Sequence, residues 1–165
     1  MTRVAFSVNG SPVEAEVEPR LHLADFLREE LSLTGTHIGC EHGICGACTL
    51  LIDGEPARSC IAFAADCMGR EVRSIEGLED DSVTAALREA FSAEHALQCG
   101  YCTPGMLIAS QALLNSNPRP NEEQIRDAIG GNLCRCTGYK QIVEAIALAA
   151  RRLRGGNLPE AGHGG

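Results

Sequence analysis

Eight of the nine cysteines fall into two groups whose spacing suits iron. The first group is Cys40, Cys45, Cys48 and Cys60. Its first three members form a C-x4-C-x2-C run, the plant-type spacing for a 2Fe-2S cluster, for which the last ligand arrives from a nearby segment. Glycines at positions 39, 43 and 46 flank these cysteines. Because glycine has no Cβ, it lets backbone amides approach the cluster sulfurs. We predict that this group binds one 2Fe-2S cluster.

The second group combines a C-x2-C motif with a C-x-C motif. Its members are Cys99, Cys102, Cys134 and Cys136. Each pair precedes a predicted helix, whose free N–H groups and positive dipole end favour negatively charged thiolates. A C-x2-C motif alone would also fit a thiol–disulfide site. The two motifs together supply four thiolates, and we predict that they bind a second 2Fe-2S cluster.

Zinc is the alternative metal for either group, because structural zinc sites are also held by four thiolates. Zinc ribbons usually pair two C-x2-C motifs, whereas the first group has a single such motif with a further cysteine upstream, so iron–sulfur binding is favoured. Cys67 is left over and is interpreted as a small buried apolar side chain. The histidines show no metal-like spacing, although His42 lies inside the first cysteine loop and is a candidate for tuning its potential.

Composition and charge exclude several other classes of function. The net charge is −8, whereas nucleic-acid binding needs clustered Lys and Arg. The one basic cluster, at 151–154, ends a predicted helix and complements its dipole. No apolar run approaches the roughly 20 residues of a membrane span. The first residues lack a secretory signal, and dense cysteine in a reducing compartment indicates metal or redox centres. We therefore expect a cytoplasmic protein with no membrane span and no nucleic-acid partner.

The elements that must position the first cysteine group read as strands. Alternating apolar residues on both sides of Asn9-Gly10 predict a hairpin over 3–18. Apolar residues at helical spacing predict a short amphipathic helix over 23–31. A second hairpin is expected over 49–59 around Asp53-Gly54, with a last strand over 71–75. Two hairpins crossed by one helix form a small α+β domain.

The second half reads as four helices. Ser82 is expected to cap a helix over 82–93, and Thr103-Pro104 to cap and begin a helix over 104–115. Asn121 and Gln124 form a predicted capping box for 121–129, and the last helix is expected over 140–154. The predicted domains are therefore 1–77, a sheet domain, and 78–154, a helical domain, followed by a flexible Gly-rich tail over 155–165.

Three motifs together resemble the small iron–sulfur subunit of molybdenum hydroxylases, the xanthine oxidase family. They are the cysteine loop over 39–49, Gln98-Cys99-Gly100-Tyr101-Cys102-Thr103-Pro104-Gly105-Met106, and Gly131-Asn132-Leu133-Cys134-Arg135-Cys136-Thr137-Gly138-Tyr139. The resemblance covers about residues 3–153, and the family includes carbon monoxide dehydrogenase and heteroaromatic oxidoreductases. This chain departs from the commonest loop of the family at Glu41-His42-Gly43-Ile44, where a second acidic residue is often found, without touching a ligand.

The resemblance implies a ferredoxin-like β-grasp domain followed by a four-helix domain, each with one 2Fe-2S cluster. It implies partners, namely a large subunit with the molybdopterin cofactor, in its cytosine dinucleotide form, and a medium subunit with FAD, in a heterotrimer or a dimer of heterotrimers. Electrons would pass from molybdenum through the second cluster and then the first to FAD. By motif, Gln98 and the backbone of Cys136 would approach the pterin; without the resemblance, a helix-end hydrogen bond would be the preferred role of Gln98.

Two other functions remain open at the level of sequence. A free-standing two-cluster ferredoxin would use the same ligands, and a zinc-stabilised interaction module would use no redox chemistry. An independently active enzyme is disfavoured, because no nucleophile–base group, phosphate loop or flavin motif is present. The sequence does not specify the substrate of the complex, its electron acceptor or the cluster potentials.

Overall fold

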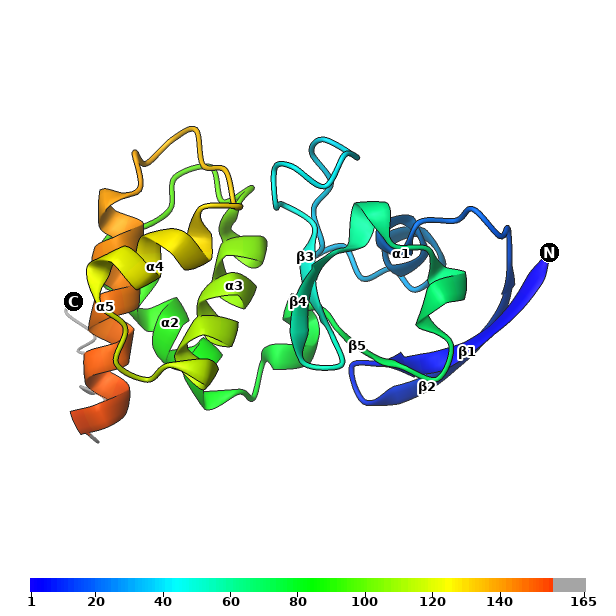
Figure 1. Ribbon diagram of the computed structural model, residues 1–165, viewed down its shortest axis with the longest axis horizontal. Helices are drawn as coiled ribbons and strands as arrows, with labels where there is room; N and C mark the ends of the chain where they lie inside the picture. Colours follow the sequence, from blue (N-terminus) through cyan, green and yellow to red (C-terminus); the bar gives the residue numbers. More distant parts are fainter. Residues whose placement is uncertain (156–165) are drawn as a thin grey trace, which may run out of the picture.

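The computed structural model describes residues 1–155, and its N-terminal half is a mixed five-stranded sheet (Figure 1). Strands β1 (Thr2–Val8) and β2 (Ser11–Val17) form the predicted hairpin. Asn9 and Gly10 both take positive φ, as a two-residue turn of this kind requires. The alternating residues Val4, Phe6 and Val8 are buried, so the hairpin presents one apolar face to the core.

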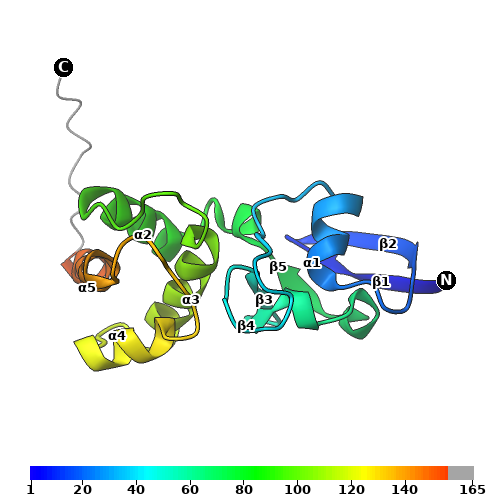
Figure 2. The same cartoon turned by 90° about the horizontal axis from the view of Figure 1, so that it is seen from above.

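The rest of the sheet follows the order β2-β1-β5-β3-β4. Strands β3 (Thr49–Ile52) and β4 (Glu55–Arg58) form the second predicted hairpin, while β5 (Glu71–Arg73) is shorter than expected and runs parallel to β1. The predicted helix is present as α1 (Leu23–Asp25), which continues as a π-helical turn over Phe26–Glu30. Its Leu23, Phe26 and Leu27 are buried in the core of the sheet domain. Figure 2 shows the helix lying across the sheet. Single 3-10 turns occupy Ser59–Ile61, Ala64–Cys67 and Ile75–Leu78.

The C-terminal half contains the four predicted helices, with corrections at two of their starts. Helix α2 (Ser82–Ala93) is capped by Asp81 rather than Ser82, because the Asp81 carboxylate accepts the Thr84 N–H at 2.7 Å. Helix α3 (Thr103–Ser116) begins one residue early, and Thr103 is its first residue rather than its cap, so its hydroxyl makes no capping bond. Cys102 occupies the cap position instead.

The other two helices agree with the sequence. Helix α4 (Glu122–Ile129) begins with the predicted capping box of Asn121 and Gln124. Helix α5 (Lys140–Gly155) follows the C-x-C motif and includes Gly155. The predicted flexible tail over 155–165 therefore lies, after Gly155, outside the described residues. Within residues 1–155 no helix has both the length and the apolar character needed to cross a bilayer.

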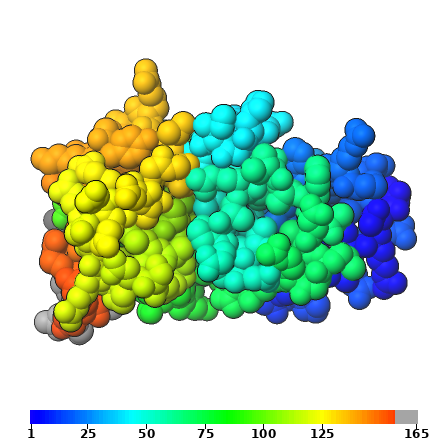
Figure 3. All heavy atoms as spheres, viewed as in Figure 1, coloured from blue at the N-terminus to red at the C-terminus, as the bar shows by residue number. Residues whose placement is uncertain are grey.

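Helix α3 belongs to the cores of both halves. Met106, Leu107 and Leu114 pack among the helices, whereas Ile108 is buried in the apolar core of the sheet. In Figures 1 and 3 the two halves lie side by side along the long axis with α3 against the second hairpin, and the space-filling view shows no gap between them on that face. The predicted division between residues 77 and 78 stays a prediction, and the two halves share apolar contacts, of which Ile108 of α3 is the most deeply buried.

Replacing Ile108 by alanine should therefore destabilise the sheet from a position in the helical half. Removal of a buried Ile side chain costs about 2–5 kcal/mol of unfolding free energy. We expect amide hydrogen exchange in β3 to rise in Ile108→Ala, measured by mass spectrometry. The neighbouring Leu107→Ala is the control, because it removes a side chain that packs in the helical core. Equal protection of β3 in the two variants would contradict the shared-helix description.

Candidate iron–sulfur centres

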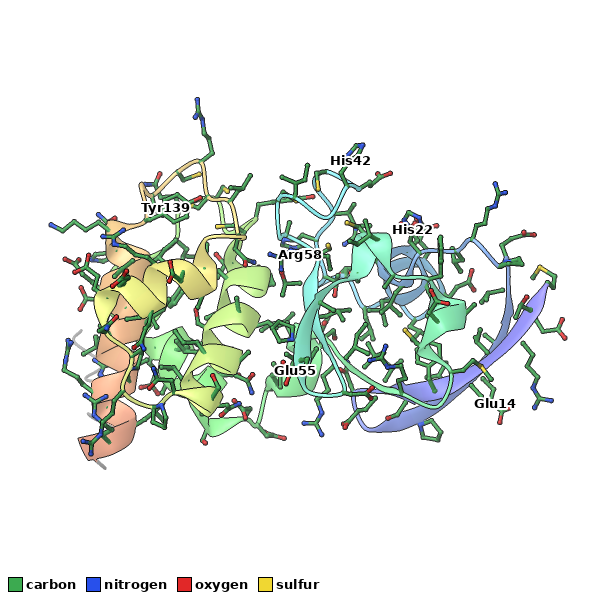
Figure 4. All side chains as sticks on the ribbon, viewed as in Figure 1. Glu14, His22, His42, Glu55, Arg58 and Tyr139 are labelled. Carbon is green, nitrogen blue, oxygen red and sulfur yellow. The ribbon has the colours of Figure 1, made fainter. Side chains whose placement is uncertain are left out.

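The loop that leads into β3 carries three cysteines of the first group, and the 3-10 turn after β4 carries the fourth. In Figure 1 this loop stands at the upper edge, next to the second hairpin, and Figure 4 places His42 at its tip. Gly43 and Gly46 take positive φ within it, as expected for a tight loop with glycines between ligands. Ser59 donates its hydroxyl to the Cys48 carbonyl at 2.8 Å and so fixes the turn that carries Cys60 beside the loop.

Backbone N–H groups converge on the Cys40 sulfur. Those of Cys45, His42 and Ile44 lie 3.3, 3.3 and 3.4 Å from Cys40 Sγ, and they lower the pKa of this thiol to about 6. The His42 ring also turns back to the Cys40 carbonyl. Hydrogen bonds to a thiolate sulfur are the contacts that stabilise and tune an iron–sulfur cluster. The loop is therefore shaped for a negatively charged sulfur at position 40.

Cys60 has the opposite environment within the same group. Burial, together with the neighbouring Cys48 thiol, raises the pKa of Cys60 to about 11, although the Gly43 N–H acts in the other direction. Because a metal ligand must lose its proton, binding at Cys60 has to release one at neutral pH. Cys40 and Cys48 both lie close enough to Cys60 to affect its pKa, and the Cys45 N–H contacts the Cys40 sulfur. The structure therefore brings the four cysteines of the first group together.

The second group surrounds a cavity of about 180 Å³. All four of its cysteines line this cavity, and the sulfur atoms of Cys99 and Cys136 are 3.6 Å apart. Burial and the adjacent Cys134 raise the pKa of Cys102 to about 12. Burial by itself would raise the pKa of the Cys134 thiol. Hydrogen bonds from Thr137 and the Cys136 N–H outweigh burial and lower this pKa. The Thr137 hydroxyl lies 3.1 Å from Cys134 Sγ.

The donor sets fit two-iron clusters. None of the nine cysteines is disulfide-bonded, and Cys67 is buried away from both groups, as predicted. No three His, Cys, Asp or Glu side chains of residues 1–155 converge on a single ion-sized point. A 2Fe-2S cluster does not need that convergence, because its four thiolates are divided between two irons. Beside Cys102, the Thr103 hydroxyl is buried without a hydrogen-bond partner in the described chain, so a donor is free next to a predicted ligand.

Gln98 joins the two motifs of the second group. Its side-chain amide donates to the Cys136 carbonyl at 3.1 Å, so the two residues that the sequence singled out lie together. This bond crosses between the loop before α3 and the loop before α5. Cys99 and Cys136 are both exposed, which opens this end of the cavity to the surface.

Three residues make contacts between the two halves that were not predicted from the sequence. Asn132 is buried and reaches Gly46 and Thr49. Arg58, which Figure 4 shows on the second hairpin, donates to the Gly131 carbonyl at 2.7 Å. Tyr101 stacks on His37 with ring centroids 4.7 Å apart and donates to the Ile38 carbonyl. The only signal in the sequence is that Tyr101 and Asn132 stand inside the cysteine motifs, and Arg58 carries no signal at all.

At two glycines the sheet half and the helical half meet backbone to backbone, and we call this contact the junction. A Cβ at Gly46 would overlap the Gly131 carbonyl oxygen, and a Cβ at Gly105 would overlap the Gly46 carbonyl oxygen. As a result the first cysteine loop contributes Gly39, Cys45 and Ala47 to the wall of the cavity that holds the second group. The two thiol groups are thus neighbours across the junction.

Comparison with known proteins agrees with this arrangement. A family described as a 2Fe-2S iron-sulfur cluster binding domain matches residues 6–73, and one described as a 2Fe-2S binding domain matches residues 74–147. The gamma subunit of caffeine dehydrogenase from Pseudomonas sp. (strain CBB1) is 50% identical over 146 residues, which cover 87% of each chain. The small subunit of nicotine 6-hydroxylase from Paenarthrobacter nicotinovorans is 51% identical over 139 residues, or 84% of each chain.

A solved structure gives the same result. The crystal structure of quinoline 2-oxidoreductase from Pseudomonas putida 86 contains a chain that is 47% identical, with a TM-score of 0.87 over 95% of this chain and 98% of that one. Fold and thiol sites together define a protein with two 2Fe-2S-binding domains, one built on a sheet and one on helices. The relatives are about half identical to this chain over most of its length, and this similarity narrows the class to one family. The chain belongs to the family of small 2Fe-2S subunits of molybdenum hydroxylases, within which it is an iron–sulfur electron-transfer subunit of a multi-subunit complex.

Gly46→Ala should disrupt both the junction between the two halves and iron binding at the first site. Both Gly46 and Gly54 take positive φ, for which a side chain costs about 1–2 kcal/mol. Nothing lies within 4 Å of a Cβ at Gly54, so Gly54→Ala measures the backbone strain alone. We expect Gly46→Ala to lose more unfolding free energy in urea, and iron per chain, than Gly54→Ala. Equal losses in the two variants would contradict the close contact.

Proposed function

We propose that this subunit relays electrons from a molybdopterin centre on a large subunit to FAD on a medium subunit. The electrons pass first through the site of Cys99, Cys102, Cys134 and Cys136, and then through the site of Cys40, Cys45, Cys48 and Cys60. When bound, each 2Fe-2S cluster accepts and releases one electron at a time. The single observation that carries this order is the cavity of the second thiol group, which is walled by Cys45 and opens to the surface at Cys99 and Cys136.

The residues around each site perform separate tasks in this relay. The N–H groups of His42, Ile44 and Cys45 hold negative charge on the Cys40 sulfur. Burial of Cys48 and Cys60 keeps water from one side of the first site. Cluster potential depends on hydrogen bonds to sulfur and on solvent exposure, so the loop and the buried turn both set it.

Gln98 and Cys136 are proposed to face the pterin of the large subunit. Gln98 already holds the Cys136 carbonyl through its amide nitrogen, which leaves the amide oxygen for a second partner. Exposed apolar side chains lie at this end of the second site, where Tyr101 and Leu133 line the cavity and Leu97 directly precedes Gln98 in the chain. An exposed apolar rim at a redox site suits a permanent subunit interface. We propose a heterotrimer, or a dimer of heterotrimers, with molybdopterin cytosine dinucleotide in the large subunit.

The names of the relatives support a nitrogen heterocycle as the substrate of the complex. Those proteins are named for caffeine, nicotine and quinoline, and each of these compounds contains a nitrogen-bearing ring. This chain supplies no substrate-transforming group in the proposal, so the ring is oxidised on the large subunit. A nicotine or quinoline oxidation assay of the complex tests this part, with an aldehyde and carbon monoxide as competing substrates.

Purification of the intact complex tests the proposal as a whole. A tagged version of this chain, produced with the subunits of its own source cell, should retain two further chains, molybdenum and flavin through gel filtration. Recovery of this chain alone with both clusters would instead support a free-standing two-cluster ferredoxin. Recovery with bound zinc, without visible absorbance or acid-labile sulfide, would support a zinc module and overturn the relay.

Cys99→Ser should remove one cluster and leave the other. The substitution takes a thiolate from the second site only, so the paramagnetic signal of that site should vanish after reduction, while the signal of the first site persists. Substrate should then reduce molybdenum without reducing flavin. Cys67→Ser is the matched control, because Cys67 belongs to neither group, and it should keep both signals. Two unaltered signals in Cys99→Ser would contradict the ligand assignment.

A further inference from the structure

Asn132 is a buried polar residue at the junction between the two thiol groups. Its side chain is only 2% exposed, and its amide nitrogen donates to the Gly46 carbonyl at 3.0 Å and to the Thr49 hydroxyl at 3.1 Å. Both acceptors belong to the sheet half, immediately beside Cys45 and Cys48. A buried amide with two such partners is costly to disturb, because either loss leaves a polar group unsatisfied.

The residue after Asn132 links the two thiol groups directly. The Leu133 N–H donates to the Cys45 carbonyl at 2.8 Å, and Leu133 is followed by Cys134. A single hydrogen bond therefore joins a cysteine of the first group to the residue bonded to a cysteine of the second. The Asn132 N–H is itself held by the Ile129 carbonyl at the end of α4, also at 2.8 Å, so the position of this segment is fixed from the helical side.

We propose that Asn132 is a positioning residue for electron transfer between the two clusters. It fixes the segment 131–134 on the first cysteine loop, and so keeps the Leu133 N–H on the Cys45 carbonyl. The inference rests on the proposed relay and adds a residue to it. The step moves one electron, with no bond made or broken, so one centre is oxidised as the other is reduced. What Asn132 controls is the separation and the bonded connection between them.

The chemistry of the junction explains why an amide is needed there. Gly46 offers a carbonyl that already accepts the Thr49 N–H and hydroxyl, and the Thr49 hydroxyl also accepts from Arg58. Both groups present oxygen atoms to the helical half, so a donor there is attracted and an acceptor is repelled. An aspartate would have the same shape as Asn132 but would aim carboxylate oxygens at the Gly46 carbonyl. Asn132→Asp is therefore an isosteric change that reverses the sign of the interaction.

The test compares Asn132→Asp with Asn115→Ala in the complete, cluster-loaded complex. Asn115 is an exposed asparagine near the end of α3 and serves as the control. In Asn132→Asp we expect full iron and sulfide, both paramagnetic signals, loss of part of the spin–spin splitting between the two reduced clusters, and slower electron exchange between them after flash reduction. Hydrogen exchange at the Leu133 amide should rise. Asn115→Ala should match the wild type in all of these.

The outcomes separate the inference from the relay that it extends. Unchanged splitting and transfer rate in cluster-loaded Asn132→Asp would overturn the positioning role, as would a Leu133 amide that stays protected. Absence of one or both clusters from the wild type would instead overturn the proposed relay. If Asn132→Asp does not accumulate in folded form, Thr49→Val is the second variant, because it removes one acceptor of the Asn132 amide and should give a smaller change in the spin–spin splitting. Thr49→Ser keeps the hydroxyl and should show the same splitting as the wild type. No change in Thr49→Val would also overturn the inference.

Discussion

The close contact between the backbone of Gly46 and the backbone of the helical half is the constraint on which the rest of this structure depends. Gly46 meets Gly131 on one side and Gly105 on the other, at distances that leave no room for a Cβ. Because of this contact, the loop that carries the predicted ligands of the first cluster also forms part of the wall of the cavity lined by the second cysteine group. Hydrogen bonds from Asn132 and Arg58 lock the same contact. A subunit that only relays electrons needs little else than two sites held at a fixed short separation.

The two sites differ in the groups that stabilise negative charge on their cysteine sulfurs. In the first, three N–H groups face one sulfur and lower the pKa of Cys40, while burial raises the pKa of Cys60. In the second, half-buried Cys102 lies beside Cys134, whose thiolate is stabilised by hydrogen bonds from Thr137. Since hydrogen bonds and exposure set the potential of a cluster, we expect clusters bound in such different surroundings to differ in potential.

Much of the fold followed from local chemistry in the sequence. The Asn9-Gly10 and Asp53-Gly54 turns, and the Asn121 capping box, were predicted correctly because each depends on residues adjacent in the chain. The cap of α2 and the start of α3 were each wrong by one residue, because Asp81 rather than Ser82 caps α2 and because Thr103 lies inside α3. Strand β5 was too long in the prediction, since its length is set by pairing with β1 and β3 rather than by its own residues.

The sequence by itself determined the two cysteine groups, the kind of cluster that they suit and the class of each half, because spacing between ligands and periodicity of apolar residues are properties of the chain. Only the tertiary structure decided that Asn132, Arg58 and Tyr101 bind the halves together, and that Ile108 of a helix completes the core of the sheet. These contacts join residues that are about 60–90 positions apart in many cases, as with the 86 positions between Asn132 and Gly46. No local pattern encodes such a pairing, because it arises when two preformed surfaces meet.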